Sequence, residues 1–255
     1  MRQRWPERLW IVRHGQSAGN VARDEASAAG KSMIDIAVRD VDVPLSPLGH
    51  RQADALGRWF AGLPEEEKPE VVLSSPYVRA RQTAKALCEA GGVTGAARPP
   101  IVDERLRERE FGILDRLTTA GIREKYPEIA DQRALMGKFY HRPPGGESWA
   151  DVILRLRGAL DTISLHHADR RVVIVCHQVV VLCVRYILEE MDEAQILAID
   201  REGDVVNCGI LEYVFEPDGD DRLCAPQLVR YNFAAPLIDE AAPVTSEPDA
   251  MVAAR

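Results

Sequence analysis

LWIVRHGQSAGN, residues 9–20, joins a short apolar run to a cluster of polar residues. The apolar part, Leu9–Arg13, stops abruptly at His14-Gly15, which is typical of a buried strand that delivers a loop. A second apolar run, Val172–Cys176, stops in the same way at His177. Nearly all of its residues are apolar, so it is expected to be buried on both faces, as strands of parallel sheets are.

The rest of the chain alternates short strands with helices. Serine hydroxyls before apolar periodic segments predict helix N-caps, and proline suits the first helical turn. We expect further strands at Val71–Leu73, Ile101-Val102, Val205–Phe215 and Leu228–Phe233, and helices at Ser46–Gly62, Ser75–Ala90, from Ser148 and at Val179–Glu190. This alternation predicts an α/β fold, a three-layer α/β/α arrangement with a mainly parallel central sheet.

Three segments depart from this pattern. Val21–Val43 is small, mixed and non-periodic, so at most short helical turns are expected there. Leu117–Tyr140 predicts one or two short helices broken at Tyr126-Pro127, within a helical cap insertion over about residues 113–146. Residues 1–235 are predicted to form one domain. Residues 236–255 are predicted to be a C-terminal tail with no evident core of its own.

Composition and charge exclude several classes of function. The chain has 255 residues with 32 Lys+Arg and 40 Asp+Glu, so its formal charge is 32 − 40 = −8. A pI near 5.4 argues against nucleic-acid and anionic-membrane partners, which attract a surplus of basic residues. No apolar stretch is long enough to span a bilayer, and Leu9–Val12 is too short for a signal-peptide core. Five cysteines without a C-x-x-C pair indicate reduced thiols and a cytoplasmic location.

The polar residues that follow the predicted strands suggest one pocket, because ligands of open α/β sheets bind at the carboxyl ends of the strands. Two arginines, Arg13 and Arg79, and two histidines, His14 and His177, would form a local positive cluster suited to a tetrahedral anion. A neutral histidine there can attack phosphorus and form a phosphohistidine. Glu108 or Glu110 could protonate the leaving alcohol.

These residues resemble the histidine phosphatase superfamily, also called phosphoglycerate mutase-like. The resemblance rests on five motifs in order, which are R-H-G-x-S-x-x-N at 13–20, D-x-x-L-S-x-x-G-x-x-Q-A at 42–53, S-S-P-x-x-R-A-x-x-T-A at 74–84, L-x-E-x-x-F-G at 106–112 and P-G-G-E-S at 144–148, followed by the strand that ends at His177. It implies His14 as nucleophile, Arg13 and Arg79 as phosphate clamp, His177 as a second phosphate-holding histidine and Glu108 as acid/base. It also implies phosphate or substrate contacts from Gln16, Ser17, Asn20 and Gln178, and neither metal nor cofactor.

The run Ile174–Gln178 is most similar to the fructose-2,6-bisphosphatase-type branch. The residues that grip the sugar phosphate in that branch are only partly matched. Thr119, Trp149 and Leu182 differ from it, whereas Lys138 keeps the type and Arg133 is a second candidate for doing so. We therefore expect a different substrate from fructose-2,6-bisphosphate. The basic residues of the cap are either an ordinary solvated face or a surface that selects the substrate, namely Arg116, Arg123, Lys125, Arg133, Lys138 and Arg142.

The sequence therefore predicts a metal-independent, histidine acid phosphatase-like phosphomonoesterase that acts on a small phosphorylated substrate. A phosphoglycerate mutase-type phosphoryl transferase and a non-catalytic phosphate-binding module are the alternatives. A homodimer is left open.

Overall fold

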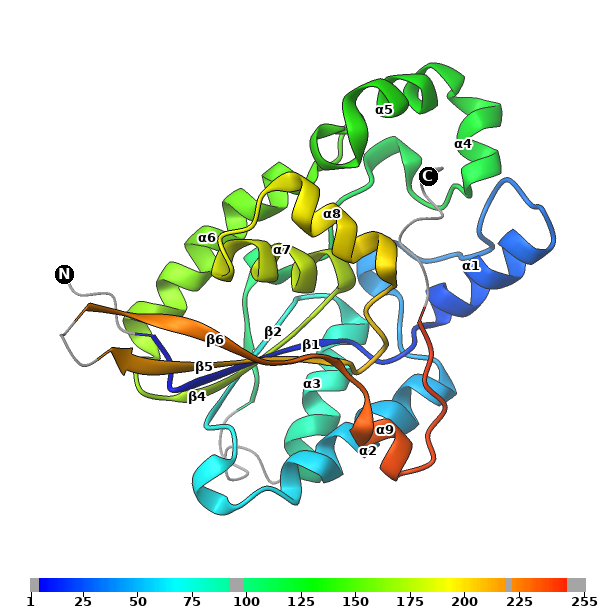
Figure 1. Ribbon diagram of the computed structural model, residues 1–255. Coiled ribbons are helices and arrows are strands. Elements are labelled where there is room, and N and C mark those ends of the chain that lie inside the picture. Colours follow the sequence, from blue (N-terminus) through cyan, green and yellow to red (C-terminus); the bar gives the residue numbers. More distant parts are fainter. Residues whose placement is uncertain (1–4, 92–98, 219–221, 247–255) are drawn as a thin grey trace.

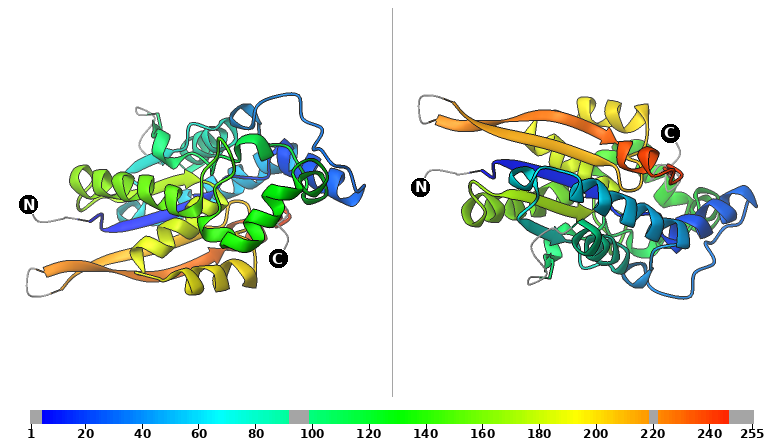
Figure 2. Two further views of the ribbon diagram at one scale, coloured as in Figure 1. Left: turned by 90° about the horizontal axis from the view of Figure 1, so that it is seen from above. Right: turned by 90° about the horizontal axis from the view of Figure 1, so that it is seen from below.

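The computed structural model describes residues 5–91, 99–218 and 222–246. Within them the strands form a six-stranded sheet in the order β3-β2-β4-β1-β5-β6 (Figure 1). The parallel strands are β1 (Arg8–Arg13), β2 (Val71–Ser74), β3 (Ile101–Val102) and β4 (Arg171–Cys176). The hairpin of β5 (Ile210–Asp218) and β6 (Arg222–Phe233) continues the sheet antiparallel to β1 and runs along one edge of the molecule (Figure 2). The prediction of a mainly parallel α/β sheet is confirmed.

Helices cover both faces of this sheet, which completes the three layers (Figure 1). One layer contains α6 (Trp149–His166), α7 (Gln178–Leu188) and α8 (Glu193–Glu202), and the other contains α2 (Pro47–Ala61), α3 (Val78–Gly91) and α9 (Ala235–Asp239). Successive side chains of a strand point to opposite faces. Leu9 and Ile11 of β1 accordingly pack in the α6–α7 core, whereas Trp10 and Val12 pack in the α2–α3 core.

A separate lobe, the cap, lies beyond the carboxyl ends of the parallel strands (Figure 1). It contains α4 (Thr119–Lys125) and α5 (Pro127–Tyr140), which pack around a small apolar cluster of Leu114, Leu117, Ile122 and Ile129. The predicted break is present at Tyr126, whose backbone leaves the helical region before Pro127. The cap rests on the segment after α1, where the Thr118 hydroxyl donates to the carbonyl of Lys31.

Part of the expectation for Val21–Val43 is wrong, because α1 (Ala18–Ala28) is a regular helix. It forms despite its weak apolar periodicity because Ser17 and Asn20 make a capping box at its N-terminus. The strand expected from Val205 begins only at Ile210, since Cys208 adopts a positive φ of 55° that interrupts extended backbone. The helix expected from Ser75 begins at Val78.

The chain from α9 to residue 246 packs on the rest of the domain. Leu237 of α9 is fully buried in the α2–α3 core, and Ala242 packs against the same core. Beyond it, Gln52 of α2 donates to the carbonyl of Pro243 at 2.8 Å and to the hydroxyl of Thr245 at 2.9 Å. Asn207, which donates to the carbonyl of His14, receives support from the same Thr245. The described part of the C-terminal segment therefore braces the loop that follows β1.

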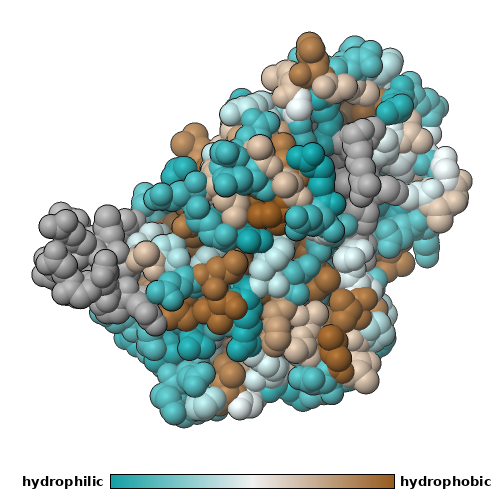
Figure 3. Space-filling model, viewed as in Figure 1, coloured by the Kyte–Doolittle hydropathy of each residue, from teal (hydrophilic) through white to brown (hydrophobic). Residues whose placement is uncertain are grey.

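Among the described residues, no helix is both long enough and apolar enough to cross a bilayer. Figure 3 shows hydrophilic and hydrophobic side chains intermixed over the face that it displays.

Candidate active site

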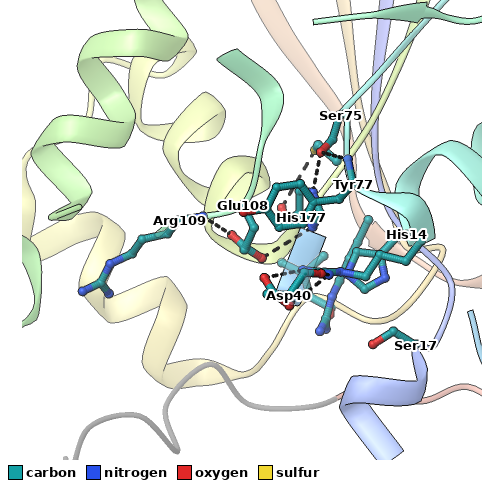
Figure 4. A network of polar contacts seen from close by, with 12 residues as sticks. His14, Ser17, Asp40, Ser75, Tyr77, Glu108, Arg109 and His177 are labelled. Atoms are coloured by element: carbon teal, nitrogen blue, oxygen red, sulfur yellow. Dashed lines mark hydrogen bonds and ion pairs between the residues drawn. The ribbon is translucent and has the colours of Figure 1, made fainter. Parts of the chain in front are cut away.

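Two parallel neighbours, β1 and β4, bring the predicted histidines together. Arg13 and Cys176 are paired in the sheet register, and His14 and His177 each follow one of them. The backbone N–H of His14 donates to the carbonyl of Cys176 at 2.9 Å. The two imidazole rings meet edge to face, with centroids 5.1 Å apart (Figure 4). The expected convergence at the carboxyl ends of the strands is therefore present.

The His14 ring is held in one tautomer. Its Nδ1 lies 2.7 Å from the carbonyl oxygen of Gly15, which can only accept, so Nδ1 carries the proton. The lone pair of Nε2 then accepts a hydrogen bond from Nε of Arg79 at 3.2 Å. Burial, followed by the positive charges of Arg79 and Arg13, lowers the pKa of His14 well below 6.5. His14 is thus a neutral imidazole whose Nε2 is available as a nucleophile.

His177 is fully buried opposite His14, between Ser75 and Glu108. Its Nε2 lies 2.7 Å from the Ser75 hydroxyl, and its Nδ1 lies 3.7 Å from Oε2 of Glu108 (Figure 4). Burial, followed by the charge of Arg79, lowers the pKa of His177 well below 6.5. The ring of Tyr77 packs edge to face on the ring of His177, with centroids 5.0 Å apart.

The two arginines lie against the histidines with their guanidinium groups held by backbone and carboxylate oxygens. Arg13 is buried and donates to the carbonyl of Val205. Arg79 is also buried; its Nε contacts His14, and its Nη1 and Nη2 contact the carboxylate of Asp40. Both cations adjoin the neutral imidazole of His14, so the pocket can stabilise negative charge.

The structure distinguishes Glu108 from Glu110. Glu108 is buried beside His177, and its Oε1 accepts a hydrogen bond from the backbone N–H of Arg109 at 2.8 Å. Glu110 is exposed. The loop that carries Glu108 is held by Arg155, which donates to the carbonyl of Glu108 at 3.2 Å and to both carboxylate oxygens of Glu147.

Gln16, Ser17 and Asn20 have local structural partners. The Ser17 hydroxyl donates to Oδ1 of Asn20 at 2.6 Å and accepts from the Asn20 backbone N–H, which completes the cap of α1. Oε1 of Gln16 accepts from the Ser46 hydroxyl at 2.7 Å. The Gln16 backbone lies so close to α2 that a Cβ at Gly49 would stand 1.9 Å from the Gln16 carbonyl oxygen. Nδ2 of Asn20 is the group that this side chain could direct toward a phosphate.

Gln178 and at least three of the six basic residues of the cap bind other side chains or backbone carbonyls of the protein. Nε2 of Gln178 donates to Asp204 at 2.7 Å. Lys138 pairs with Asp200 of α8 at 2.6 Å, and Arg142 pairs with Asp151 at the start of α6. Nη1 of Arg116 donates to the carbonyl of Ile36 at 3.0 Å. These contacts favour structural roles for Lys138, Arg142 and Arg116.

Sequence reasoning missed three residues of the pocket, namely Asp40, Ser75 and Tyr77. Ser75 and Tyr77 lie inside the motif at 74–84, next to Arg79, and their positions directly after β2 were a usable signal. Asp40 lies in a segment without periodicity, where no local pattern marks it. In the part of the chain that the structure describes, no group of three or more His, Cys, Asp or Glu side chains is arranged to hold a metal ion.

Comparisons with known proteins agree with this geometry. The sequence pattern of the family described as Histidine phosphatase superfamily (branch 1) matches residues 9–223. A Caenorhabditis elegans 6-phosphofructo-2-kinase/fructose-2,6-bisphosphatase is 34% identical over 183 residues, which cover 70% of this chain and 33% of that protein. The chain therefore spans about a third of that relative's length. A putative phosphoserine phosphatase 2 of Hydrogenobacter thermophilus is 28% identical over 207 residues, with 78% of this chain and 91% of that protein covered.

Among solved structures, a mycobacterial glucosyl-3-phosphoglycerate phosphatase superposes with a TM-score of 0.68 at 27% identity. The superposition covers 89% of this chain and 98% of the mycobacterial chain.

Proposed function

Because this chain belongs to the histidine phosphatase superfamily, branch 1, we propose that it hydrolyses a small phosphate monoester through a phosphohistidine at His14. The observation that carries the proposal is the state of the His14 ring. Its Nδ1 proton is held by the Gly15 carbonyl, and its low pKa keeps the ring neutral, so Nε2 has a lone pair near neutral pH.

In the first step Nε2 of His14 attacks phosphorus in line with the ester oxygen. The N–P bond forms and the P–O bond to the alcohol breaks. Arg79 gives up its hydrogen bond to Nε2 as this lone pair is used, and its Nε–H turns to a phosphoryl oxygen. The positive charges of Arg13 and Arg79 and an N–H of the neutral His177 ring meet the charge on the equatorial oxygens, so the two arginines supply the stabilisation that a metal ion supplies in other phosphatases.

Glu108 is proposed to supply the proton that the leaving alcohol needs. Its carboxyl lies in the pocket, with Oε2 3.7 Å from Nδ1 of His177. In the second step the same carboxylate accepts a proton from water, which attacks phosphorus, breaks the N–P bond and releases inorganic phosphate. Its burial and its place beside the second histidine support Glu108 over the exposed Glu110.

The substrate is proposed to be a small ester other than fructose-2,6-bisphosphate. Lys138, which keeps the residue type of the fructose-2,6-bisphosphatase branch, is paired with Asp200 at 2.6 Å. Trp149 and Leu182, which stand at positions used for sugar binding in that branch, are buried in the α6–α7 core. Small phosphorylated acids and sugars, which the names of several relatives specify, are therefore the substrates to test first.

The deciding experiment measures phosphate release from p-nitrophenyl phosphate in excess chelator, for the wild type and His14→Asn. We expect activity in the wild type that survives the chelator and falls at least 10³-fold in the variant, because the nucleophile is removed. Quenching of the wild type with alkaline detergent during turnover should trap a phosphoprotein that is stable in base and loses its phosphate in acid. His50→Asn, at an exposed site on α2, is the matched control and should retain wild-type activity.

Three outcomes contradict the proposal. Activity that persists in His14→Asn would show that another group is the nucleophile. Loss of wild-type activity in chelator would show that a metal ion takes part. A wild type that transfers phosphate between phosphoglycerates without releasing it would be a mutase.

A further inference from the structure

The arginine assigned to the phosphoryl group is already bound by an anion of the chain itself. Arg79 donates from Nη1 to Oδ1 of Asp40 at 3.0 Å and from Nη2 to Oδ2 at 3.2 Å. Nη1 also donates to the backbone carbonyl of Asp40 at 2.7 Å, and Nε donates to His14. The carboxylate thus takes both ends of the guanidinium fork in the bidentate geometry that phosphate also uses.

A carboxylate and a phosphoryl group cannot both occupy the same two N–H groups of one guanidinium. On the basis of the proposed function, we propose that Asp40 is an intramolecular competitor for Arg79 and sets the affinity of the pocket for inorganic phosphate. A phosphoryl group at Nε2 of His14 can meet the Nε–H of Arg79, which lies 3.2 Å from that atom. It gains the Nη1 and Nη2 donors that now hold the Asp40 carboxylate only by displacing that carboxylate.

The position of Asp40 among the other pocket residues supports this competition. Figure 4 shows its carboxylate within the group formed by His14, Glu108 and His177. Burial, followed by the charge of Asp40, raises the pKa of Tyr77, whose ring packs on His177. Burial, again followed by the charge of Asp40, raises the pKa of Asp115 at the base of the cap. The carboxylate therefore faces the pocket between the histidines and the cap.

The segment that carries Asp40 can release it without opening a core. The segment is anchored by Ile34, whose N–H donates to the carbonyl of Arg116 at 2.8 Å, and by Val43, which is buried. Residues 35–42 between these anchors are exposed or half-buried. The Asp40 side chain is 37% exposed, whereas that of Arg79 is 6% exposed. Release of the Asp40 side chain therefore breaks its ion pair with Arg79 and exposes no buried apolar surface.

This competition weakens binding of both the ester and free phosphate. When the binding-competent state is a fraction of the population, apparent affinity falls by that fraction. An ester keeps the additional contacts of its alcohol part, whereas inorganic phosphate has only the contacts of its own oxygens. Asp40 therefore keeps the affinity for the product low and favours its release.

Calorimetric titration of the intact protein with inorganic phosphate tests the proposal in the wild type, Asp40→Asn and Asp42→Asn. The control removes the same charge two residues away, where Asp42 pairs with the exposed Arg39 at 2.9 Å. We expect the Kd for phosphate to fall roughly tenfold in Asp40→Asn, as for a site freed from an internal competitor. In Asp42→Asn the change should stay below about twofold, the size of a screened surface charge effect.

Product inhibition by phosphate in the aryl phosphate assay should strengthen in parallel in Asp40→Asn. Asp40→Ser also removes the carboxylate but leaves a smaller side chain, and it should give the same increase in affinity. It tests the proposal if Asp40→Asn folds poorly.

An unchanged or weaker affinity for phosphate in both Asp40 variants would overturn the proposal, because Asp40 would then only orient Arg79. An equal gain in Asp42→Asn would also overturn it, by showing a general charge effect. Lack of phosphate binding in every variant would do the same. If the variants show the expected gain but the wild type hydrolyses no ester, the competition stands and the proposed hydrolase activity fails.

Discussion

The hydroxyl oxygen of Ser75 lies 2.7 Å from Nε2 of His177 and accepts a hydrogen bond from the backbone N–H of Tyr77 at 3.3 Å. A hydroxyl proton donated to Nε2 places the ring proton of His177 on Nδ1, the atom that faces Oε2 of Glu108 and the pocket. We predict that Ser75 holds His177 in this tautomer, in which Nδ1 can donate to a phosphoryl oxygen.

Replacement of this hydroxyl should impair catalysis with little loss of stability. We expect Ser75→Ala to lower kcat/KM roughly tenfold, because His177 loses the group that fixes its donor side. The measurement is steady-state turnover of an aryl phosphate alongside thermal denaturation. Ser74→Ala removes a buried neighbouring hydroxyl that donates to the Ser75 carbonyl, and it is the matched control. Equal losses in the two variants would refute the assignment of the tautomer to Ser75.

The role of Glu108 should depend on the leaving group. In Glu108→Gln we expect kcat/KM for an alkyl phosphate to fall by about 10²–10⁴, the usual contribution of a general acid. With p-nitrophenyl phosphate the loss in kcat/KM should be smaller, because nitrophenolate leaves without a proton. Glu110→Gln, at the exposed position two residues on, should leave both values within about twofold. A loss of equal size for both substrates would count against proton donation by Glu108.

The acid limb of the pH–rate profile should lie below the ordinary titration range of histidine. Burial, Arg79 and Arg13 lower the pKa of His14 well below 6.5, so Nε2 keeps its lone pair as the pH falls through 6.5. The protonated ring has no lone pair for phosphorus, and kcat/KM should decline only at more acidic pH. The profile of kcat/KM for the aryl phosphate measures this limb directly. A midpoint at or above 6.5 would contradict the electrostatic environment described here.

His14 and His177 should make the fold less stable in acid. Their pKa values in the folded protein are well below 6.5, so below that pH the unfolded chain binds more protons than the folded protein. The free energy of unfolding should therefore decrease as the pH falls below 6.5, by up to about 1.4 kcal/mol per pH unit for each histidine. Urea denaturation of the wild type and His14→Asn over this range should show a shallower slope in the variant. Parallel slopes would show that His14 is not held neutral by the fold.

The Lys138–Asp200 pair should act on stability and leave substrate affinity unchanged. Its side chains are 18% and 7% exposed, and the ion pair joins α5 of the cap to α8. Lys138→Met leaves the Asp200 carboxylate without this partner, and we expect a loss of about 3 kcal/mol in the free energy of unfolding. The double variant with Asp200→Leu should recover much of this loss, since neither charge then remains unpaired. A rise in KM without a loss of stability would instead identify Lys138 as a substrate-binding residue.

The strands and the polar residues at their ends were accessible from local sequence. β1 and β4 are short apolar runs whose burial on both faces follows from composition, and the residues that follow a parallel strand lie at its carboxyl end. His14 and His177 could therefore be placed in one pocket before any contact was known. The break between α4 and α5 was also accessible from local sequence, because Pro127 favours the end of one helix before it and the start of the next.

The use of each side chain in the pocket was decided by contacts between residues far apart in the chain. Arg79 meets Asp40 across 39 residues of sequence, and His177 meets Ser75 across 102. No periodicity encodes such pairs, since a side chain's hydrogen bonds depend on which elements the fold places beside it. The same limit hid the roles of Ser17 and Asn20 in capping α1 and the packing of α9 on α2. The sequence by itself determined which polar residues follow the buried strands, because strand burial follows from the local run of apolar residues. Only the tertiary structure decided their hydrogen bonds, tautomers and partners, because these arise from the packing of distant segments.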